Sequence, residues 1–330
     1  MKWLFFLLAS MLAGFAPAQA QQEPIVVRFS HVVAPDTPKG RAAVRFQELA
    51  EQATHGRVRV RVYPNSELYR DREELEALQL GAVEMIAPSL AKLGPLGVRD
   101  FDVFDLPFLF PDVRAVHRVT QGAIGMDMLR RLRLKGVIGL AFWDNGFKSF
   151  SANRPLHQPA DLAGLRMRIQ PSRVLDAQMR ALGAQPMTMQ FGEVHAALEA
   201  GVVDGTENPP SNFYTQAMQD VQTHFTVSNH GYLGYAVIVN RKFWEGLPSD
   251  IRTALEGAVQ EATDYAASIA QEENDRALEA IRASGKTQVH VLTDAERAAW
   301  KQALAPVHTE MEHLIGAQLI ADIRRTIDAP

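Results

Sequence analysis

The pattern of hydrophobic and polar positions in the first part of the chain alternates between strand and helix. Residues 25–33 are rich in β-branched side chains and predict a strand. In residues 42–53 the apolar side chains recur at helical spacing, which predicts a helix with one buried face. Residues 57–62 alternate arginine with valine, and this period of two predicts a strand whose valines face a core.

The same order continues with a second helix. Asp71 and Glu74 are spaced as a capping pair and predict the start of this helix. A strand is expected over residues 83–87. The strand–helix–strand–helix–strand order favours an α/β unit with a mostly parallel sheet. A loop rich in Phe, Pro and Asp (100–112) follows, and then a helix to about Arg133.

A second α/β unit is expected in the middle of the chain. A strand over 137–143 precedes this unit. The predicted elements that follow are a strand over 166–169, helices over 172–182 and 191–200, and a strand over 235–240. The last strand is apolar enough to return to the first sheet.

One segment is too long to belong to a single small domain. From Pro248 to Ser284 the chain keeps helical spacing and contains no internal proline and only one glycine, Gly257. Such a helix would extend on the order of 50 Å at about 1.5 Å per residue. We expect it to run along two lobes, which favours a clam-shaped binding protein over an enzyme with one core. The expected lobes are residues 21–145 plus about 234–273, and residues 146–233 plus about 274–330.

The N-terminus has the pattern of an export signal. Lys2 precedes an apolar run over residues 3–15, and Ala18 and Ala20 form the small-x-small pattern of a signal peptidase site. The run is shorter than the roughly 20 apolar residues that span a bilayer. No cysteine lies near Ala20, so a lipid anchor is not expected. We expect residues 1–20 to be a signal peptide cleaved near Ala20, and the mature protein to lie in the periplasm.

Composition and charge exclude several classes of function. The chain has no cysteine, which excludes thiol chemistry and Cys-ligated zinc. Without Lys2 it carries 33 basic and 38 acidic side chains, and this net charge of −5 gives no electrostatic support for nucleic-acid binding. An anion site must then be built from local groups.

Motifs for catalysis are missing as well. The sequence has no H-E-x-x-H, G-x-S-x-G, P-loop or G-x-G-x-x-G pattern. His308 and His313 are five residues apart, a spacing that does not align two metal ligands on a helix. We therefore expect no catalytic residue, no metal site and no cofactor.

Residue types suited to a carboxylate occur at informative places instead. A carboxylate binder needs a guanidinium, one or two ammonium groups, amide donors and an apolar wall. Arg168 lies at the end of a predicted strand, where ligands of open α/β sheets bind. Arg166 shares its face because of the period of two, and spacing alone does not separate the two arginines.

Four further positions are candidates, each with an ordinary structural alternative. Lys148 lies at a predicted crossover between the lobes, and Lys39 lies at a predicted helix start, which favours anions. A solvated lysine is the alternative for both. Asn208 precedes a proline and avoids the helical region, so it is either a turn former or an amide aimed at a ligand. Phe191 is either core or the apolar wall of a pocket.

Eight short segments carry a resemblance to a known family. They are His31–Ala34 with Thr37–Gly40, Tyr63–Leu68, Leu75–Gly81, Phe104–Phe108, Trp143–Lys148, Gly164–Ile169, Phe191–Val194 and Val203–Pro209. In this order they span essentially all of the mature chain, which resembles the DctP-type solute-binding proteins of tripartite ATP-independent periplasmic (TRAP) transporters. The resemblance implies a type II-like, two-lobe periplasmic binding protein fold, with mixed sheets flanked by helices and a long helix spanning both lobes.

The resemblance also implies roles for residues of the second lobe. Arg168 would pair with a substrate carboxylate. Asn208 would donate a hydrogen bond to the same region, and Phe191 would pack beside the ligand.

Further implied roles concern a second carboxylate. Lys148 stands where sialic-acid binders carry arginine, and its point charge, together with Lys39, suits the second carboxylate of a dicarboxylate. Ser89 would line the pocket, with Arg70 and Tyr235 as neighbours.

The implied function is capture of a small organic acid by closure of a cleft. The expected acid is a C4-dicarboxylate such as succinate, malate or fumarate. A monomer without a cofactor would deliver it to a permease made of a small and a large membrane subunit. A monocarboxylate, keto acid, aromatic acid or sugar acid as the ligand, a ligand-sensing role, and an exported enzyme or chaperone stay open as alternatives.

Overall fold

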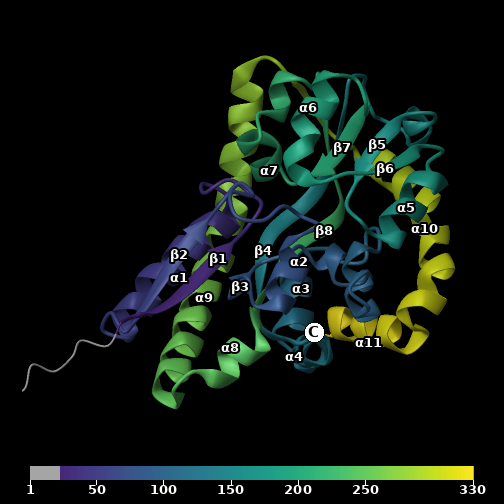
Figure 1. Ribbon diagram of the computed structural model, residues 1–330. Helices are drawn as coiled ribbons and strands as arrows, with labels where there is room; N and C mark the ends of the chain where they lie inside the picture. Colours follow the sequence, from purple (N-terminus) through teal and green to yellow (C-terminus); the bar gives the residue numbers. More distant parts are fainter. Residues whose placement is uncertain (1–22, 330) are drawn as a thin grey trace, which may run out of the picture.

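The structure is a computed structural model that describes residues 23–329. The expected signal peptide, residues 1–20, lies outside the described residues. No helix within 23–329 combines the length and the apolar character needed to cross a bilayer. Figure 1 shows the described residues as helices arranged around a central set of strands.

All named strands of residues 23–329 belong to one mixed sheet. They are β1 (Ile25–Ser30), β2 (Val58–Tyr63), β3 (Met85–Ile86), β4 (Val137–Ala152), β5 (Arg166–Ile169), β6 (Gln185–Thr188), β7 (Gly205–Asn208), β8 (His224–Asn240) and β9 (Gln288–Val291). Neighbouring strands follow the order β2-β1-β3-β8-β4-β7-β5-β6, and β9 pairs with β8. β1 pairs in parallel with β2 and β3 in the first lobe, and β5 pairs in parallel with β6 and β7 in the second (Figure 1).

Two long antiparallel strands, β4 and β8, join the sheets of the two lobes into one. The sequence predicted only their apolar parts, over 137–143 and 235–240, so both strands were ended too early. The apolar pattern stops at polar residues that are nevertheless buried and hydrogen-bonded, such as Asp144 and His230. The pairing register shifts between Asp144 and Gly146, where Gly146 has a φ of 155° that favours glycine.

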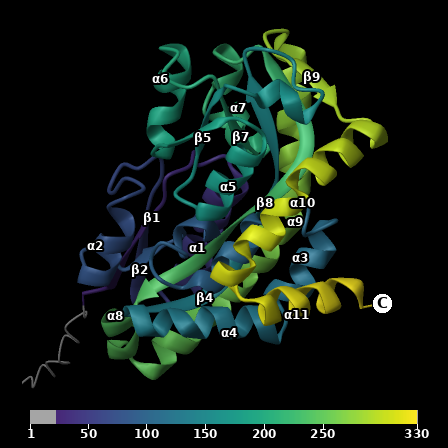
Figure 2. The ribbon, with the colours of Figure 1, turned by 90° about the vertical axis from the view of Figure 1, so that its right-hand side faces the viewer.

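Helices cover both faces of this sheet. They are α1 (Pro38–Ala53), α2 (Glu74–Leu80), α3 (Val113–Thr120), α4 (Ala123–Arg131), α5 (Arg173–Ala181), α6 (Val194–Glu199), α7 (Pro210–Thr215), α8 (Arg241–Gly246), α9 (Ser249–Ser284), α10 (Asp294–Ile315) and α11 (Ala317–Asp328). The C-terminal helices return along the molecule, with α10 against α5 and α11 against α3 (Figure 2).

Alternate residues of β8 face two different hydrophobic cores. Val237 and Val239 pack with residues of α1 and α9. Ala236 and Ile238 pack on the opposite face, in a core that continues into the second lobe. Another core of the second lobe surrounds Phe213. Both faces of the central strand are therefore buried, as its almost uninterrupted apolar pattern requires.

Two local predictions were wrong. α2 begins at Glu74 without a side-chain cap, because the carboxylates of Asp71 and Glu74 pair with Lys92 instead of the helix terminus. The helix expected to continue to Arg133 is divided into α3 and α4, because Gly122 adopts an extended conformation between them.

α9 is the long helix that the sequence predicted. Its 36 residues would extend about 54 Å, and they pack on α1 in the first lobe, on β4, and on α7 in the second lobe (Figure 1). Asn274, which is buried in this helix, donates from Nδ2 to the carbonyl of Asn145 at 2.6 Å. Its Oδ1 accepts from the backbone N–H of Ser211 at 3.1 Å. Asn274 thereby ties α9 to both the connecting strand β4 and the second lobe.

Replacing this residue should destabilise the protein measurably. Asn274→Ala would leave the Asn145 carbonyl and the Ser211 N–H without these partners, at a cost of about 1–3 kcal/mol. Gln271→Ala, on the exposed face of the same helix, removes only a contact with Asp275 and should change stability by less than about 0.5 kcal/mol. Urea unfolding measures both values, and equal unfolding free energies for the two variants would contradict the assigned role of Asn274.

Candidate functional site

Arg168 lies near the carboxyl end of β5 and is separated from Arg166 by its surroundings. Met167, between them, points into the core. The Arg166 side chain is 40% exposed and pairs with Asp204 at 2.7 Å. Arg168 is only 2% exposed. The two arginines that sequence spacing could not distinguish therefore differ in burial, and only Arg168 is a buried cation.

The contacts of Arg168 hold its guanidinium in place without neutralising it. Nε and Nη2 donate to the carbonyl of Met189 at 3.1 and 2.9 Å, and the guanidinium lies 5.7 Å from the centre of the Phe191 ring. Burial lowers the pKa of Arg168, while the charges of Asp71 and Glu207 act in the opposite direction. Neither carboxylate forms an ion pair with it among the described residues.

The first lobe supplies a second buried cation. Lys39 lies in the first turn of α1, whose N-cap is Thr37, and is fully buried. Its Nζ donates to the carbonyl of Ala87 at 2.9 Å and lies 3.8 Å from the centre of the Tyr235 ring. Burial lowers the pKa of Lys39 to about 7. Its ammonium is therefore close to losing its proton at neutral pH.

Ser89 and Tyr235 reach from the first lobe toward the second. They pair with each other through a backbone bridge. Ser89 Oγ accepts a hydrogen bond from Gln170 Nε2 at 2.7 Å, just after β5. The Tyr235 hydroxyl accepts from Asn212 Nδ2 at 3.4 Å. The structure thus connects the surroundings of Lys39 with the strand end that carries Arg168.

Lys148 is buried as well, but its charge is already paired. Its Nζ lies 2.9 Å from Glu207 Oε1 and 3.6 Å from Asp105 Oδ1. The other Glu207 oxygen lies 2.8 Å from His230 Nε2. Burial would raise the pKa of Glu207, but Lys148 and His230 more than offset this effect and lower it to about 2. The direct contact between Lys148 and a ligand carboxylate stays a prediction, and two carboxylates of the protein already contact this ammonium.

Asn208 is the last residue of β7, and it lies at the same end of the parallel strands as Arg168. It is buried, and its Nδ2 donates to Thr206 Oγ1 at 3.3 Å. Thr206 is the register partner of Arg168 in the neighbouring strand. Asn208 is therefore a strand-end amide and not a turn former.

Phe191 and Arg70 lie on either side of the contact between the lobes. The backbone N–H of Phe191 donates to the carboxylate of Asp71 in the first lobe. The ring of Phe191 is buried beside Arg168. Arg70 is exposed and lines a surface hollow at this contact. The structure brings Phe191 into the buried cluster and leaves Arg70 outside it.

A buried ion-pair group beside the site was not predicted from the sequence. Lys92 pairs with the carboxylates of Asp71 and Glu74, the latter at 2.5 Å. Burial alone would lower the pKa of Lys92. The carboxylates of Asp71 and Glu74 more than offset this effect, so the pKa of Lys92 is raised. The spacing of Asp71 and Glu74 was a signal, but nothing in the sequence linked it to a lysine 18 residues beyond Glu74.

The described residues bury four lysine or arginine side chains, and these fall into two kinds. They are Lys39, Lys92, Lys148 and Arg168. Lys92 and Lys148 each lie against two carboxylates. Within residues 23–329, no carboxylate forms an ion pair with Arg168 or Lys39. Their positive groups contact carbonyl oxygens and aromatic rings instead. Because a buried charge without a counter-charge is costly, these two cations are suited to an incoming anion.

A cavity of about 340 Å³ gives access to Arg168. Its wall includes Arg168 and Gln170 from the second lobe, and Asp71 and Lys92 from the first. The cavity therefore lies between the two lobes. Within residues 23–329, the one group of side chains arranged like metal ligands involves none of these residues.

Several buried polar atoms in this region lack a hydrogen-bond partner among residues 23–329. They are both ring nitrogens of His31, Asn212 Oδ1, Asn145 Nδ2 and Ser149 Oγ. Asn212 contacts Tyr235, and Ser149 is the register partner of Asn208. Since buried polar groups are normally hydrogen-bonded, this concentration fits the lining of a site for a polar ligand.

Sequence comparison identifies the family of the chain. The profile of DctP, described as bacterial extracellular solute-binding protein, family 7, matches residues 29–314. The chain is 63% identical over 316 residues to the C4-dicarboxylate-binding periplasmic protein DctP of Rhodobacter capsulatus. The matched segment covers 96% of this chain and 94% of that protein.

Solved structures of similar proteins share the fold of this chain. A TRAP periplasmic solute binding protein from Shewanella oneidensis with bound succinate has a TM-score of 0.90 and 41% identity, covering 92% of this chain and 100% of that one. A counterpart from Pseudomonas aeruginosa with bound L-malate has a TM-score of 0.85 and 43% identity, covering 87% and 100%. The predicted two-lobe fold and the predicted family are confirmed. The chain belongs to the DctP-type family of TRAP solute-binding proteins.

Proposed function

We propose that this chain is the periplasmic subunit of a TRAP transporter that captures a C4-dicarboxylate such as succinate, malate or fumarate. The observation that carries the proposal is the pair of buried cations without a contacting carboxylate, Arg168 and Lys39. The charge of Asp71 acts on both Arg168 and Lys39, and two positive groups around this carboxylate suit an acid with two carboxylates. The relatives with bound succinate and L-malate support this choice.

Arg168 takes the first carboxylate. The carbonyl of Met189 holds Nε and Nη2, so the guanidinium is oriented and its remaining N–H groups are directed to the solute. A guanidinium pairs with a carboxylate through charge-assisted hydrogen bonds that are about twice as strong as neutral ones. Asn208 donates from the neighbouring strand end, and Phe191 forms the apolar wall.

Lys39 takes the second carboxylate, with Ser89 and Tyr235 beside it. Lys148 acts as a positioning residue, because it holds Glu207 next to Asn208 in β7. This assignment replaces the direct contact that the sequence suggested for Lys148. Arg70 stays at the rim, where it attracts anions without binding the solute in the closed state.

Contacts between the lobes provide the mechanism of capture. Asp71 accepts from the N–H of Phe191, and Ser89 accepts from Gln170, so the described arrangement is a closed one. A solute that touches both lobes only when they are closed shifts the population toward this state. A Kd of about 1 μM corresponds to about −8 kcal/mol, and charged hydrogen bonds contribute about 1.5–3 kcal/mol each.

The hinge between the lobes lies in the connecting strands. We place the boundaries at 145/146 in β4 and 233/234 in β8, close to the register shift at Gly146. We propose the same division into lobes that the sequence predicts, with α9 crossing near residue 273.

The proposed cellular role is delivery of the solute. After cleavage of the signal peptide near Ala20, the protein acts in the periplasm as a monomer, without a cofactor, catalytic activity or affinity for nucleic acid. The closed form docks on a permease of a small and a large membrane subunit. Another acid as solute (a monocarboxylate, keto acid, aromatic acid or sugar acid), or a sensing role, is the alternative.

Removing the guanidinium should weaken solute binding strongly. Arg168→Ala should lower succinate affinity by at least about tenfold, because it removes charge-assisted contacts of about 1.5–3 kcal/mol. Arg166→Ala is the matched control, since Arg166 pairs with Asp204 outside the site. Calorimetry measures both affinities, and circular dichroism verifies folding. Unchanged binding by folded Arg168→Ala would remove Arg168 from the site.

The choice of solute can be tested with a panel of acids. Succinate, malate and fumarate should raise the melting temperature, because each offers one carboxylate to Arg168 and one to Lys39. Monocarboxylates of similar size should stabilise the protein much less. A thermal-shift screen measures the difference, and stabilisation by monocarboxylates alone would refute the two-cation site.

Binding should take up a proton near neutral pH. Burial lowers the pKa of Lys39 to about 7 in the closed arrangement without solute, and a bound carboxylate favours the charged ammonium and raises this pKa. Succinate affinity should therefore fall as pH rises from about 7 to about 9, by at most about tenfold per pH unit.

The control is Lys39→Met, which keeps an apolar chain of similar length without the charge. This variant should bind more weakly at pH 7 and lose the pH dependence. Calorimetry in buffers with different ionisation enthalpies measures the proton uptake directly. A wild-type affinity that is constant over this pH range would exclude Lys39 as a partner of the solute.

A further inference from the structure

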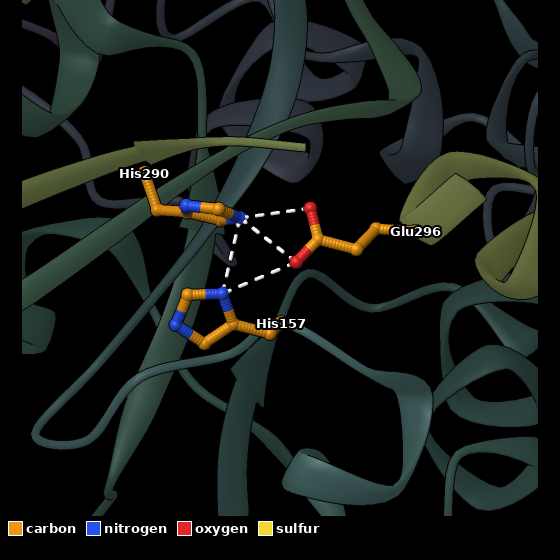
Figure 3. A group of neighbouring side chains, drawn as sticks. All are labelled: His157, His290 and Glu296. Atoms are coloured by element: carbon orange, nitrogen blue, oxygen red, sulfur yellow. Dashed lines mark hydrogen bonds and ion pairs between the residues drawn. The ribbon is translucent and has the colours of Figure 1, made fainter. Parts of the chain in front are cut away.

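Three side chains from separate parts of the second lobe converge at the molecular surface. His157 lies between β4 and α5, His290 lies on β9, and Glu296 lies in the first turn of α10 (Figure 3). His157 Nδ1 lies 3.1 Å from His290 Nε2 and 3.2 Å from Glu296 Oε1. His290 Nε2 lies 3.2 Å from the same Oε1. The three ligand atoms thus form a nearly equilateral triangle.

Hydrogen bonds cannot make all three short contacts between these atoms favourable at the same time. Each imidazole nitrogen carries at most one hydrogen, which points at one partner. If both nitrogens donate to Glu296, two N–H groups face each other across the 3.1 Å between His157 and His290. If one nitrogen donates to the other, the donor has no hydrogen left for the carboxylate. A cation inside the triangle would interact favourably with all three atoms at once.

The dimensions match a zinc ion. Zinc binds histidine nitrogen at about 2.0–2.1 Å and carboxylate oxygen at about 2.0–2.2 Å, in tetrahedral geometry. Tetrahedral ligands at these distances are about 3.3–3.5 Å apart, close to the observed 3.1–3.2 Å. Two imidazoles and one carboxylate favour zinc over calcium or magnesium, which take oxygen ligands.

The surrounding contacts hold the ligands in place. The N–H of His157 donates to Asp161 Oδ2 at 2.8 Å, and its carbonyl accepts from Trp300 Nε1 at 3.0 Å. Glu296 Oε2 accepts from the N–H of Thr293 at 2.7 Å as part of a capping box and also lies 3.0 Å from His290 Nε2, while Oε1 lies 3.2 Å from a ring nitrogen of each histidine. The Thr293 hydroxyl also donates to Oε2 at 2.9 Å, so the carboxylate of Glu296 is held in one orientation.

We propose that His157, His290 and Glu296 bind one Zn²⁺ ion, with a water molecule as the fourth ligand. The side chains of His157 and His290 are 46% and 31% exposed, so the site is reachable from solvent. The ion joins β9 and the start of α10 to the segment that follows β4. It stabilises the folded second lobe by mass action. No metal site was expected from the sequence, so the structure leads here to a different conclusion.

The test uses untagged mature protein from which metals have been removed by a chelator. Calorimetric titration with ZnCl₂ should give one site per chain. Titration with CoCl₂ should give the visible absorption of a four-coordinate cobalt centre. Zinc should also raise the melting temperature, and EDTA should reverse the increase.

Matched variants identify the ligands. His290→Ala and Glu296→Gln should each weaken zinc binding at least tenfold, and glutamine keeps the capping box so that α10 still forms. His313→Ala, an exposed histidine on α10, should bind zinc like the wild type. Arg168→Ala should do so as well, which separates this proposal from the proposed solute site.

Two outcomes would overturn the proposal. One is a wild-type protein that shows no stoichiometric zinc binding, which would make the cluster a hydrogen-bonded cap of α10. The other is equal zinc affinity in His290→Ala and His313→Ala, which would place the zinc on other surface groups.

Discussion

Burial of positive charge is the constraint on which this structure depends. A lysine or arginine removed from water needs a counter-charge, and the fold supplies one to Lys92 and one to Lys148 from carboxylates of the protein itself. Arg168 and Lys39 receive only carbonyl oxygens and aromatic faces. In the proposed function, an external anion supplies the counter-charge that these two cations lack.

In the proposed function, these cations face each other across a closing cleft. Lys39 lies in the first turn of α1, and Arg168 is the residue before the last of β5. The shared strands β4 and β8 keep the lobes in register, and α9 braces both of them through Asn274. Asp71 and Phe191 form a hydrogen bond between the two lobes. The proposed mechanism couples charge neutralisation by the solute to closure of the lobes.

Much of the fold followed from the sequence, because apolar periodicity and proline and glycine positions are local signals. The long helix α9 was predicted nearly to the residue. β4 and β8 were predicted too short, since their polar residues are satisfied by partners that are distant in sequence. His230, for example, is paired with Glu207 of β7.

In the site, too, local features could be predicted from the sequence and distant contacts could not. The sequence placed Arg168 at a strand end, but its difference from Arg166 depends on the ion pair between Arg166 and Asp204. The ion pairs of Lys148 likewise depend on Glu207 and Asp105, which are distant in sequence. The proposed zinc ligands are up to 139 residues apart and form no motif.

A crystal structure with succinate bound tests the central claim most directly. It should show one carboxylate on Arg168 and the other on Lys39, whereas a solute whose carboxylates avoid both cations would contradict it.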